Sequence, residues 1–189
     1  VNPDRALGLV LRACRRFGAW AAALQFLDLA RNEALSVDSW AYAGAMGACL
    51  EPSRSRITAA EDAMTLYREF TSTGAPTGWG FWITAACACE EGLLWENAIE
   101  ILSSTPPSAM EKVHLSVLRT CAQVAQWQKA VELLGAFTGD GVSLMTAYCA
   151  TIMACQCEEC WEQATSLLEE AKELEFAMAE SAKDKERPG

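Results

Sequence analysis

The chain has 189 residues, 51% of them hydrophobic, and a net charge of −10 from 15 lysines and arginines against 25 aspartates and glutamates. This acidic balance counts against generic nucleic-acid binding, because a basic surface that neutralises phosphates supplies much of that affinity. The longest apolar stretches, such as Ala41–Cys49 and Phe81–Cys89, are much shorter than the roughly 20 residues that a membrane-spanning helix needs. The opening residues 1–5 do not resemble a signal peptide.

A spaced pattern of cysteine, tryptophan and alanine recurs along the chain. Tryptophan follows cysteine by six residues, and alanine follows three residues later, at Cys14…Trp20…Ala23, Cys89…Trp95…Ala98, Cys121…Trp127…Ala130 and Cys155…Trp161…Ala164. Chance predicts only about 0.33 such cysteine–tryptophan pairs, so the four copies indicate a repeat. A degenerate copy carries Cys49, Ala60 and Ala63. The register positions 20, 60, 95, 127 and 161 have a spacing typical of stacked helix pairs.

Each copy predicts an apolar first helix, a short polar turn and a more amphipathic second helix. We place the units at residues 1–35, 36–75, 76–107, 108–140 and 141–178, followed by a charged tail at 179–189. Turn-forming residues separate the units at Gly74-Ala75-Pro76, Pro106-Pro107 and Gly139-Asp140-Gly141. The sequence therefore predicts an all-α protein, a right-handed α-solenoid of about five helix-turn-helix repeats.

Four residues in the second and third units are candidates for contact with a partner. Trp40 and Trp79 fall outside the tryptophan register, near the start of first helices, and exposed tryptophan is a common binding anchor. Five extra residues between Cys49 and Ala60 predict an enlarged loop, with Arg54 and Arg56 near its tip. These arginines are suited to phosphate or an acidic partner, and a solvated loop is the alternative.

The second helices of the last two units each predict one buried stripe. The residues fall at i, i+3, i+4 and i+7, as Trp127, Ala130, Val131 and Leu134, and again as Trp161, Ala164, Thr165 and Leu168. The recurring alanine fits a close helix crossing, where a larger side chain would push the helices apart. The repeated cysteines follow helix register rather than loop geometry. We therefore interpret them as small packing residues in a reducing compartment.

The densest cluster of possible metal ligands is Cys155, Cys157 and Cys160. Thiolates this close can share a zinc ion or an iron–sulfur cluster, which would make the chain a metal-dependent redox protein. We favour packing, because no second cysteine pair follows and the only histidine is distant. That histidine, His114, occupies a repeated aromatic position, so we expect a core or groove role. Without a phosphate loop, a serine elbow or an HExxH pattern, we expect no catalysis and no cofactor.

The units resemble pentatricopeptide repeats, in a variant similar to those of some algal lineages, with tetratricopeptide repeats as the near competitor. The resemblance covers nearly the whole chain and is clearest at Trp40-Ala41-Tyr42, Thr120-Cys121, Trp127–Leu134 and Gly74-Ala75-Pro76. It implies a location in chloroplast or mitochondrion. It also implies reading of RNA, one base per repeat, by a polar residue early in the first helix.

The base-reading positions of this chain do not fit that function. They hold Gly8, Ala43, Ile83, Leu115 and Cys149, and the partner positions hold Asp38, Gly78, Met110 and Leu144. Only Asp38 conforms to the family pattern, and without hydrogen-bonding groups one base edge cannot be told from another.

The sequence thus favours a non-catalytic scaffold that binds other protein subunits, as an accessory subunit of a photosynthetic, respiratory or ribosomal complex. The alternative is an RNA-binding factor in organellar RNA processing. It would use a basic strip of Arg5, Arg12, Arg15, Arg16, Lys112 and Arg119.

Overall fold

The computed structural model describes residues 3–33, 35–156 and 160–185, with side chains for residues 6–33, 35–156 and 160–180. Across these ranges the chain is helical and has no strand. The helices are α1 (Pro3–Phe17), α2 (Trp20–Asn32), α3 (Ser39–Cys49), α4 (Arg56–Ser72), α5 (Trp79–Gly92), α6 (Trp95–Ser104), α7 (Met110–Gln123), α8 (Trp127–Gly135), α9 (Gly141–Ala154) and α10 (Trp161–Lys185). The predicted all-α class is confirmed. No helix in the described ranges combines the length and the apolar character needed to cross a membrane.

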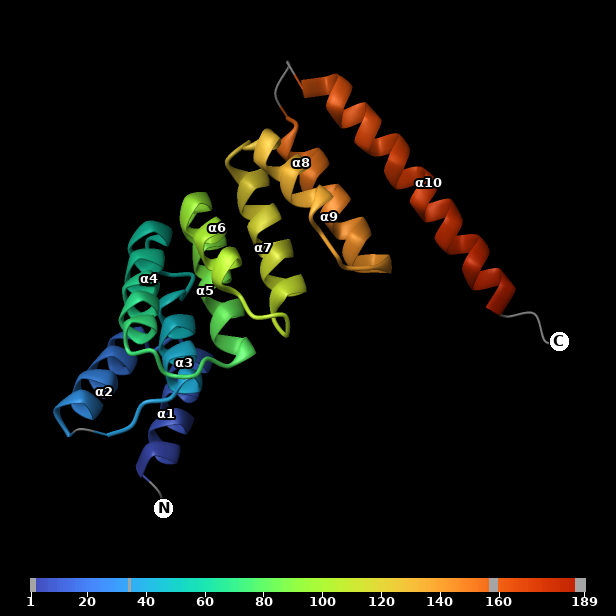
Figure 1. Ribbon diagram of the computed structural model, residues 1–189. Coiled ribbons are helices and arrows are strands. Elements are labelled where there is room, and N and C mark those ends of the chain that lie inside the picture. The colour runs from blue at the N-terminus through green and yellow to red at the C-terminus, as the bar shows by residue number, and fades with distance from the viewer. Residues whose placement is uncertain (1–2, 34, 157–159, 186–189) are drawn as a thin grey trace.

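Neighbouring helices pack in a regular pattern (Figure 1). Each odd-numbered helix packs beside the next one, so that α1, α3, α5, α7 and α9 form one layer. The even-numbered helices form a second layer, in which α2, α4, α6 and α8 each contact the odd-numbered helices before and after them. α10 packs against α9, and α1 and α10 lie at opposite ends of the array.

Small residues at the register positions allow these helices to approach closely. The repeated cysteines are all buried, namely Cys14, Cys49, Cys89, Cys121 and Cys155. The register alanines Ala23, Ala63, Ala98 and Ala130 are also buried, whereas Ala164 on α10 is half-buried. The packing role predicted for the repeated cysteines is therefore confirmed.

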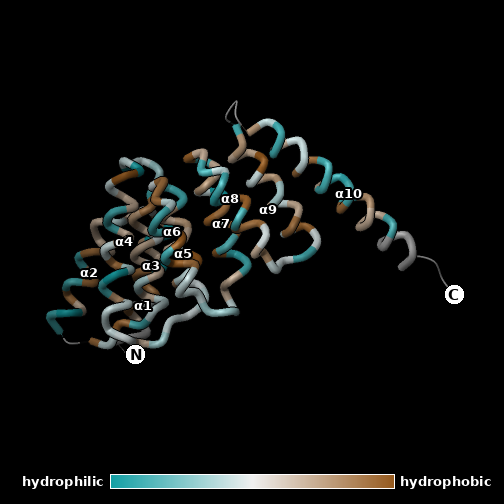
Figure 2. Tube along the Cα trace, turned by 45° about the horizontal axis from the view of Figure 1, so that its top comes forward, coloured by the Kyte–Doolittle hydropathy of each residue, from teal (hydrophilic) through white to brown (hydrophobic). Residues whose placement is uncertain are grey.

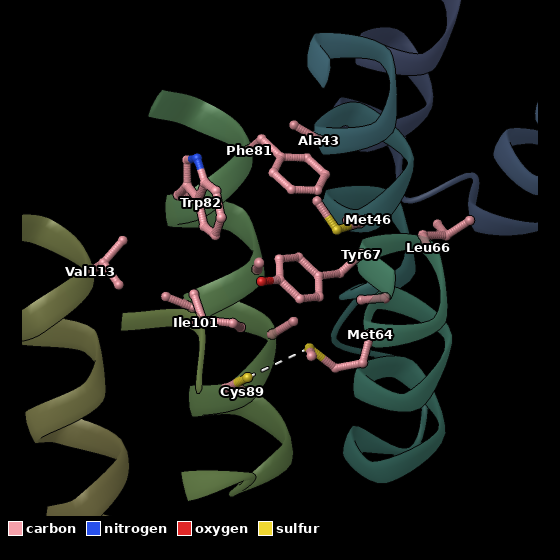
Figure 3. Close-up of a cluster of buried hydrophobic side chains, with 14 of the residues drawn as sticks. Ala43, Met46, Met64, Leu66, Tyr67, Phe81, Trp82, Cys89, Ile101 and Val113 are labelled. Carbon is pink, nitrogen blue, oxygen red and sulfur yellow. Dashed lines mark hydrogen bonds between the residues drawn. The ribbon is translucent and has the colours of Figure 1, made fainter. Parts of the chain in front are cut away.

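Large side chains fill the space between α4 and α5 (Figure 3). The Tyr67 ring on α4 stacks on Phe81 of α5, with ring centroids 5.6 Å apart, and Phe70 lies 5.0 Å from Phe81. Lower in the same interface, the Cys89 Sγ lies 3.6 Å from the Met64 Sδ. Because Phe81 is anchored in this way, the first turn of α5 is held in place, and that turn carries Trp79.

The repeated aromatic position links the two layers. Tyr42 donates a hydrogen bond of 2.6 Å to Glu69 on α4, and Tyr148 donates one of 3.2 Å to Glu170 on α10. His114 is buried, and its Nε2 donates to the Leu133 carbonyl on α8 at 2.9 Å. Burial lowers the pKa of His114 below its ordinary value of 6.5. The expectation of a core role for this histidine is therefore confirmed.

One predicted stripe is wrong. On α10, Trp161, Thr165 and Leu168 are exposed, and the buried positions are Leu167 and Ala171. The stripe on α8 does face the core, although there Leu133 is more deeply buried than Leu134. The difference has a simple cause: α9 follows α8 and covers it, whereas no further described helix covers α10.

Candidate partner-binding groove

A groove of about 720 Å³ crosses the odd-numbered layer from α1 over α3 to α5. Its lining includes Arg12, Arg15, Arg16, Trp40 and Trp79, and we call it the tryptophan–arginine groove. Trp79 also lines a second, adjoining hollow of about 330 Å³, which reaches Lys112 on α7. Side chains from α1, α3, α5 and α7 therefore lie along one surface.

The two tryptophans stand together at the starts of α3 and α5. Asp38 caps α3 by accepting a hydrogen bond from the Ala41 amide at 2.8 Å, which fixes the turn that presents Trp40. The Gly78 amide donates to Ser39 Oγ at 3.0 Å and so ties the start of α5 to the start of α3.

This arrangement places the Trp40 and Trp79 rings edge to face, with centroids 5.7 Å apart. Trp40 is 48% exposed and Trp79 is 50% exposed. Each ring thus has one side packed against the other ring and another side open to a partner.

Three arginines on α1 form the other side of the groove. None of Arg12, Arg15 and Arg16 is paired with a carboxylate within the described part of the chain. Arg15 lies across Gly47, where an added Cβ would come within 2.6 Å of its Cδ. A small residue on α3 thus makes room for the arginine stem. Lys112 completes the basic character, with its Nζ 5.7 Å from the centre of the Trp79 ring.

Not every residue of the predicted basic strip has a charge available to a partner. Arg119 donates to Glu90 from Nε at 2.8 Å and from Nη2 at 3.0 Å, and Ser116 donates to the same carboxylate at 2.7 Å. These bonds raise the pKa of Arg119 and commit its charge to the contact between α5 and α7. The side chain of Arg5 lies outside the described residues.

Arg54, one of the predicted partner-binding residues, instead holds the enlarged loop in place. Its side chain is only 12% exposed, and it donates to Asp62 at 2.6 Å and to the Cys49 carbonyl at 3.1 Å. Its guanidinium also lies 4.0 Å from the centre of the Trp20 ring. Arg56 is exposed, away from the groove, and makes a 3.3 Å ion pair with Glu91. The structure thus brings Trp40 and Trp79 together in the groove, whereas Arg54 and Arg56 line a separate hollow of about 300 Å³ at the enlarged loop.

The repeated cysteines have the character of packing residues. Burial raises the pKa of Cys49 and Cys121 to about 11 and that of Cys89 to about 12, so these thiols are protonated and unreactive at neutral pH. In the predicted cluster, Cys155 is buried and Cys157 lies outside the described residues. Cys160 is disulfide-bonded, which differs from the expectation of cysteines in a reducing compartment. Within the described ranges no three histidine, cysteine or acidic side chains gather as a metal site would require.

Two exposed apolar residues of the groove carried no signal in the repeat pattern. Leu9 and Phe17 line it from α1, and both are largely exposed. The only hint in the sequence is that Leu9, Arg12 and Arg16 share a helical face distinct from the buried one. Ala43 and Ile83, which occupy base-reading positions of the resembled family, line the same groove and offer no hydrogen-bonding side chain.

No protein-family model matches the chain, and no curated protein matches it.

Proposed function

We propose that the protein is a non-catalytic helical-repeat scaffold that binds an acidic, partly apolar segment of another protein in the tryptophan–arginine groove. The observation that carries this proposal is the pair of half-exposed tryptophans beside three arginines that have no carboxylate partner among the described side chains. Tryptophan and arginine are the residue types most enriched at the energetic centres of protein interfaces. The arginines would pair with carboxylates of the partner, and the indole rings would cover its apolar side chains.

The wider setting that we propose rests on the resemblance to pentatricopeptide repeats. The alternating helix packing supports an array of helix hairpins. We propose that this array is a right-handed solenoid of about five hairpins of the pentatricopeptide type. Such arrays present extended surfaces to partners. We place the protein in chloroplast or mitochondrion, as an accessory subunit of a photosynthetic, respiratory or ribosomal assembly.

A second candidate is RNA binding, favoured by the same arginines. Arginines beside exposed tryptophans can hold phosphates while bases stack on the indole rings. Against this, Ala43 and Ile83 provide no base-reading groups, and the chain as a whole is acidic. Any RNA binding here would therefore depend little on sequence.

The test is sedimentation of the wild-type protein and the Trp40→Ala/Trp79→Ala variant from organelle lysate, with and without RNase, at low salt and at high salt. An apolar protein interface persists when salt reduces the Debye length from about 10 Å to about 3 Å, whereas phosphate-driven binding collapses. We expect an RNase-resistant particle that the double variant leaves. High salt should weaken this particle only in part, because it screens the arginine–carboxylate pairs but not the apolar contacts of the indole rings. The matched control, Ile57→Ala on the exposed side of α4, should remain in it. Release of the wild type by RNase would favour the RNA candidate.

A further inference from the structure

A further hollow lies between α7 and α9. It measures about 180 Å³, and its apolar lining consists of Ala122 on α7 and Cys149, Ala150 and Met153 on α9. We call it the Met153 hollow. Its polar lining residues are Arg119, Gln123 and Thr146. Because an apolar cavity of about 150 Å³ is large enough to hold benzene, the Met153 hollow has room for one aromatic or leucine side chain.

The Met153 hollow is the repeat equivalent of the part of the tryptophan–arginine groove between α1 and α3. Counted from the repeated cysteine of each helix, both are lined by positions −2, +1 and +2 of the earlier helix and −9, −6 and −5 of the later one. In the groove these positions hold Arg12, Arg15, Arg16, Trp40, Ala43 and Gly44. In the Met153 hollow they hold Arg119, Ala122, Gln123, Thr146, Cys149 and Ala150. Equivalent positions in a stack of helix pairs point to the same side, so the two hollows open on one face of the odd-numbered layer.

The two hollows differ in chemistry. The groove has three arginines on its α1 side, whereas the equivalent of Arg12 in the Met153 hollow is Arg119, whose charge is bound to Glu90. α9 carries no charged residue and is apolar along most of its length (Figure 2). Cys149 is exposed and Met153 is 56% exposed, so both offer apolar surface to a ligand. The groove therefore suits carboxylates, and the Met153 hollow suits an uncharged, apolar side chain.

α7 connects the two hollows. Lys112 lines the hollow of about 330 Å³ that adjoins the groove at Trp79, and Arg119 and Gln123 line the Met153 hollow. These three residues of α7 fall at i, i+7 and i+11, which places them on one stripe of the helix. A path therefore runs from the arginines of α1, past Trp79 and along this stripe, to α9.

We propose that one extended segment of the partner follows this path. Its carboxylates meet the arginines of α1, its central apolar side chains cover Trp40 and Trp79, and one large apolar side chain enters the Met153 hollow. Charge complementarity at the α1 end and the apolar lining at the α9 end fix the direction of the segment. The inference rests on the proposed function, because the segment that fills the groove is the one that continues to the Met153 hollow.

The spacing of the helices sets the length of this segment. From α1 to α7, and from α3 to α9, there are three steps between neighbouring odd-numbered helices. Packed helices lie about 8–10 Å apart, so the two equivalent hollows are about 24–30 Å apart. An extended chain advances about 3.3 Å per residue. About eight or nine residues therefore separate the carboxylates of the partner from its apolar anchor.

The test measures binding of fluorescein-labelled peptides to the full chain by fluorescence anisotropy. Each peptide has an acidic head of alternating glutamate and leucine, a glycine–serine spacer and a terminal phenylalanine, and a matched peptide ends in serine instead. In the long peptide the phenylalanine is about ten residues from the first glutamate, a reach of about 33 Å. Its Kd should be about 10-fold lower than that of the serine peptide, because the anchor buries an aromatic side chain in a contact that the spacer makes intramolecular.

Two variants locate this contact. Met153→Glu places a charge in the Met153 hollow and should abolish the gain from phenylalanine, while it leaves the Kd of the serine peptide unchanged. The matched control, Ile57→Glu, adds the same charge at an exposed position on α4 and should retain the gain. The long phenylalanine peptide should also slow iodoacetamide labelling of Cys149, which the serine peptide should not. Circular dichroism melts of each variant separate loss of binding from loss of folding.

Two outcomes would overturn this inference and leave the proposed function intact. In the first, the serine peptide binds the wild type but not the Trp40→Ala/Trp79→Ala variant, and phenylalanine adds nothing. In the second, phenylalanine tightens binding but Met153→Glu retains the gain, which would place the anchor elsewhere. Failure of the serine peptide to bind the wild type would instead contradict the proposed function itself, and with it this inference.

Discussion

Substitution of Arg54 by methionine tests whether this arginine holds the enlarged loop or is free to meet a partner. Methionine retains an apolar stem of similar length, so the change removes mainly the charge and its hydrogen bonds. Asp62 is 42% exposed, so the ion pair contributes at most about 1 kcal/mol. The charged hydrogen bond to the Cys49 carbonyl adds about 1.5 kcal/mol, and the contact with the Trp20 ring about 0.5 kcal/mol. Arg54→Met should therefore lower the free energy of unfolding by about 2–3 kcal/mol.

Urea unfolding followed by tryptophan fluorescence and circular dichroism measures this loss. The midpoint should fall with little change in the denaturant slope. Arg56→Met is the matched control, because Arg56 and Glu91 are both more than half exposed and their ion pair contributes at most about 0.5 kcal/mol. A loss below about 1 kcal/mol for Arg54→Met, or equal losses in the two variants, would refute the structural role of Arg54.

Three further predictions concern the groove, the buried histidine and the cysteines. Replacing Trp40 and Trp79 singly by alanine should weaken partner binding by about 30-fold each, since an interface anchor contributes about 2 kcal/mol; the same variants should melt within a few degrees of wild type. Because burial lowers the pKa of His114, the unfolded chain takes up its proton first on acidification. The contribution of neutral His114 to the free energy of unfolding is therefore fully present above about pH 6.5. It is lost as the pH falls from there through the folded-state pKa, at a rate of up to about 1.4 kcal/mol per pH unit. Urea midpoints measured across this range should fall less steeply for His114→Gln, and identical slopes would contradict the assignment. Iodoacetamide labelling followed by mass spectrometry should modify exposed Cys149 in the native protein and should modify Cys89, whose pKa is about 12, only after unfolding; early labelling of Cys89 would show that α5 opens locally.

The repeat pattern was enough to predict the helices and much of the core. The cysteines and alanines at register positions are buried because a close crossing of two helices requires a small residue wherever it recurs. The aromatic position that includes Tyr42 and His114 could be located in the same way, because each member occupies the same place on its helix. The burial of these positions depends on contacts with helices that are adjacent in the sequence. Because the sequence is periodic, each repeat makes the same contacts.

The groove could be predicted only in part. Trp40 and Trp79 were identified because they break the tryptophan register, yet their edge-to-face contact depends on how α3 and α5 pack. The sequence suggested Arg54 and Arg56 as equivalent partner-binding residues, and in the fold both line one hollow but differ in burial and in their partners. Arg54 contacts the Trp20 ring on α2 and pairs with Asp62 on α4, whereas Arg56 is exposed at the surface.

By itself, the sequence determined the all-helical class, the positions of the helix pairs and the small residues between them, because hydrophobic periodicity and side-chain volume act locally. Only the tertiary structure decided which charges remain free. Arg119 is bound to Glu90 and Arg54 to Asp62, whereas Arg12, Arg15 and Arg16 have no carboxylate partner in the described ranges. Only the tertiary structure showed, too, that the stripe containing Trp161 is uncovered on α10. Pairing and burial of this kind depend on distances between helices far apart in the chain, and periodicity along one helix carries no information about those distances.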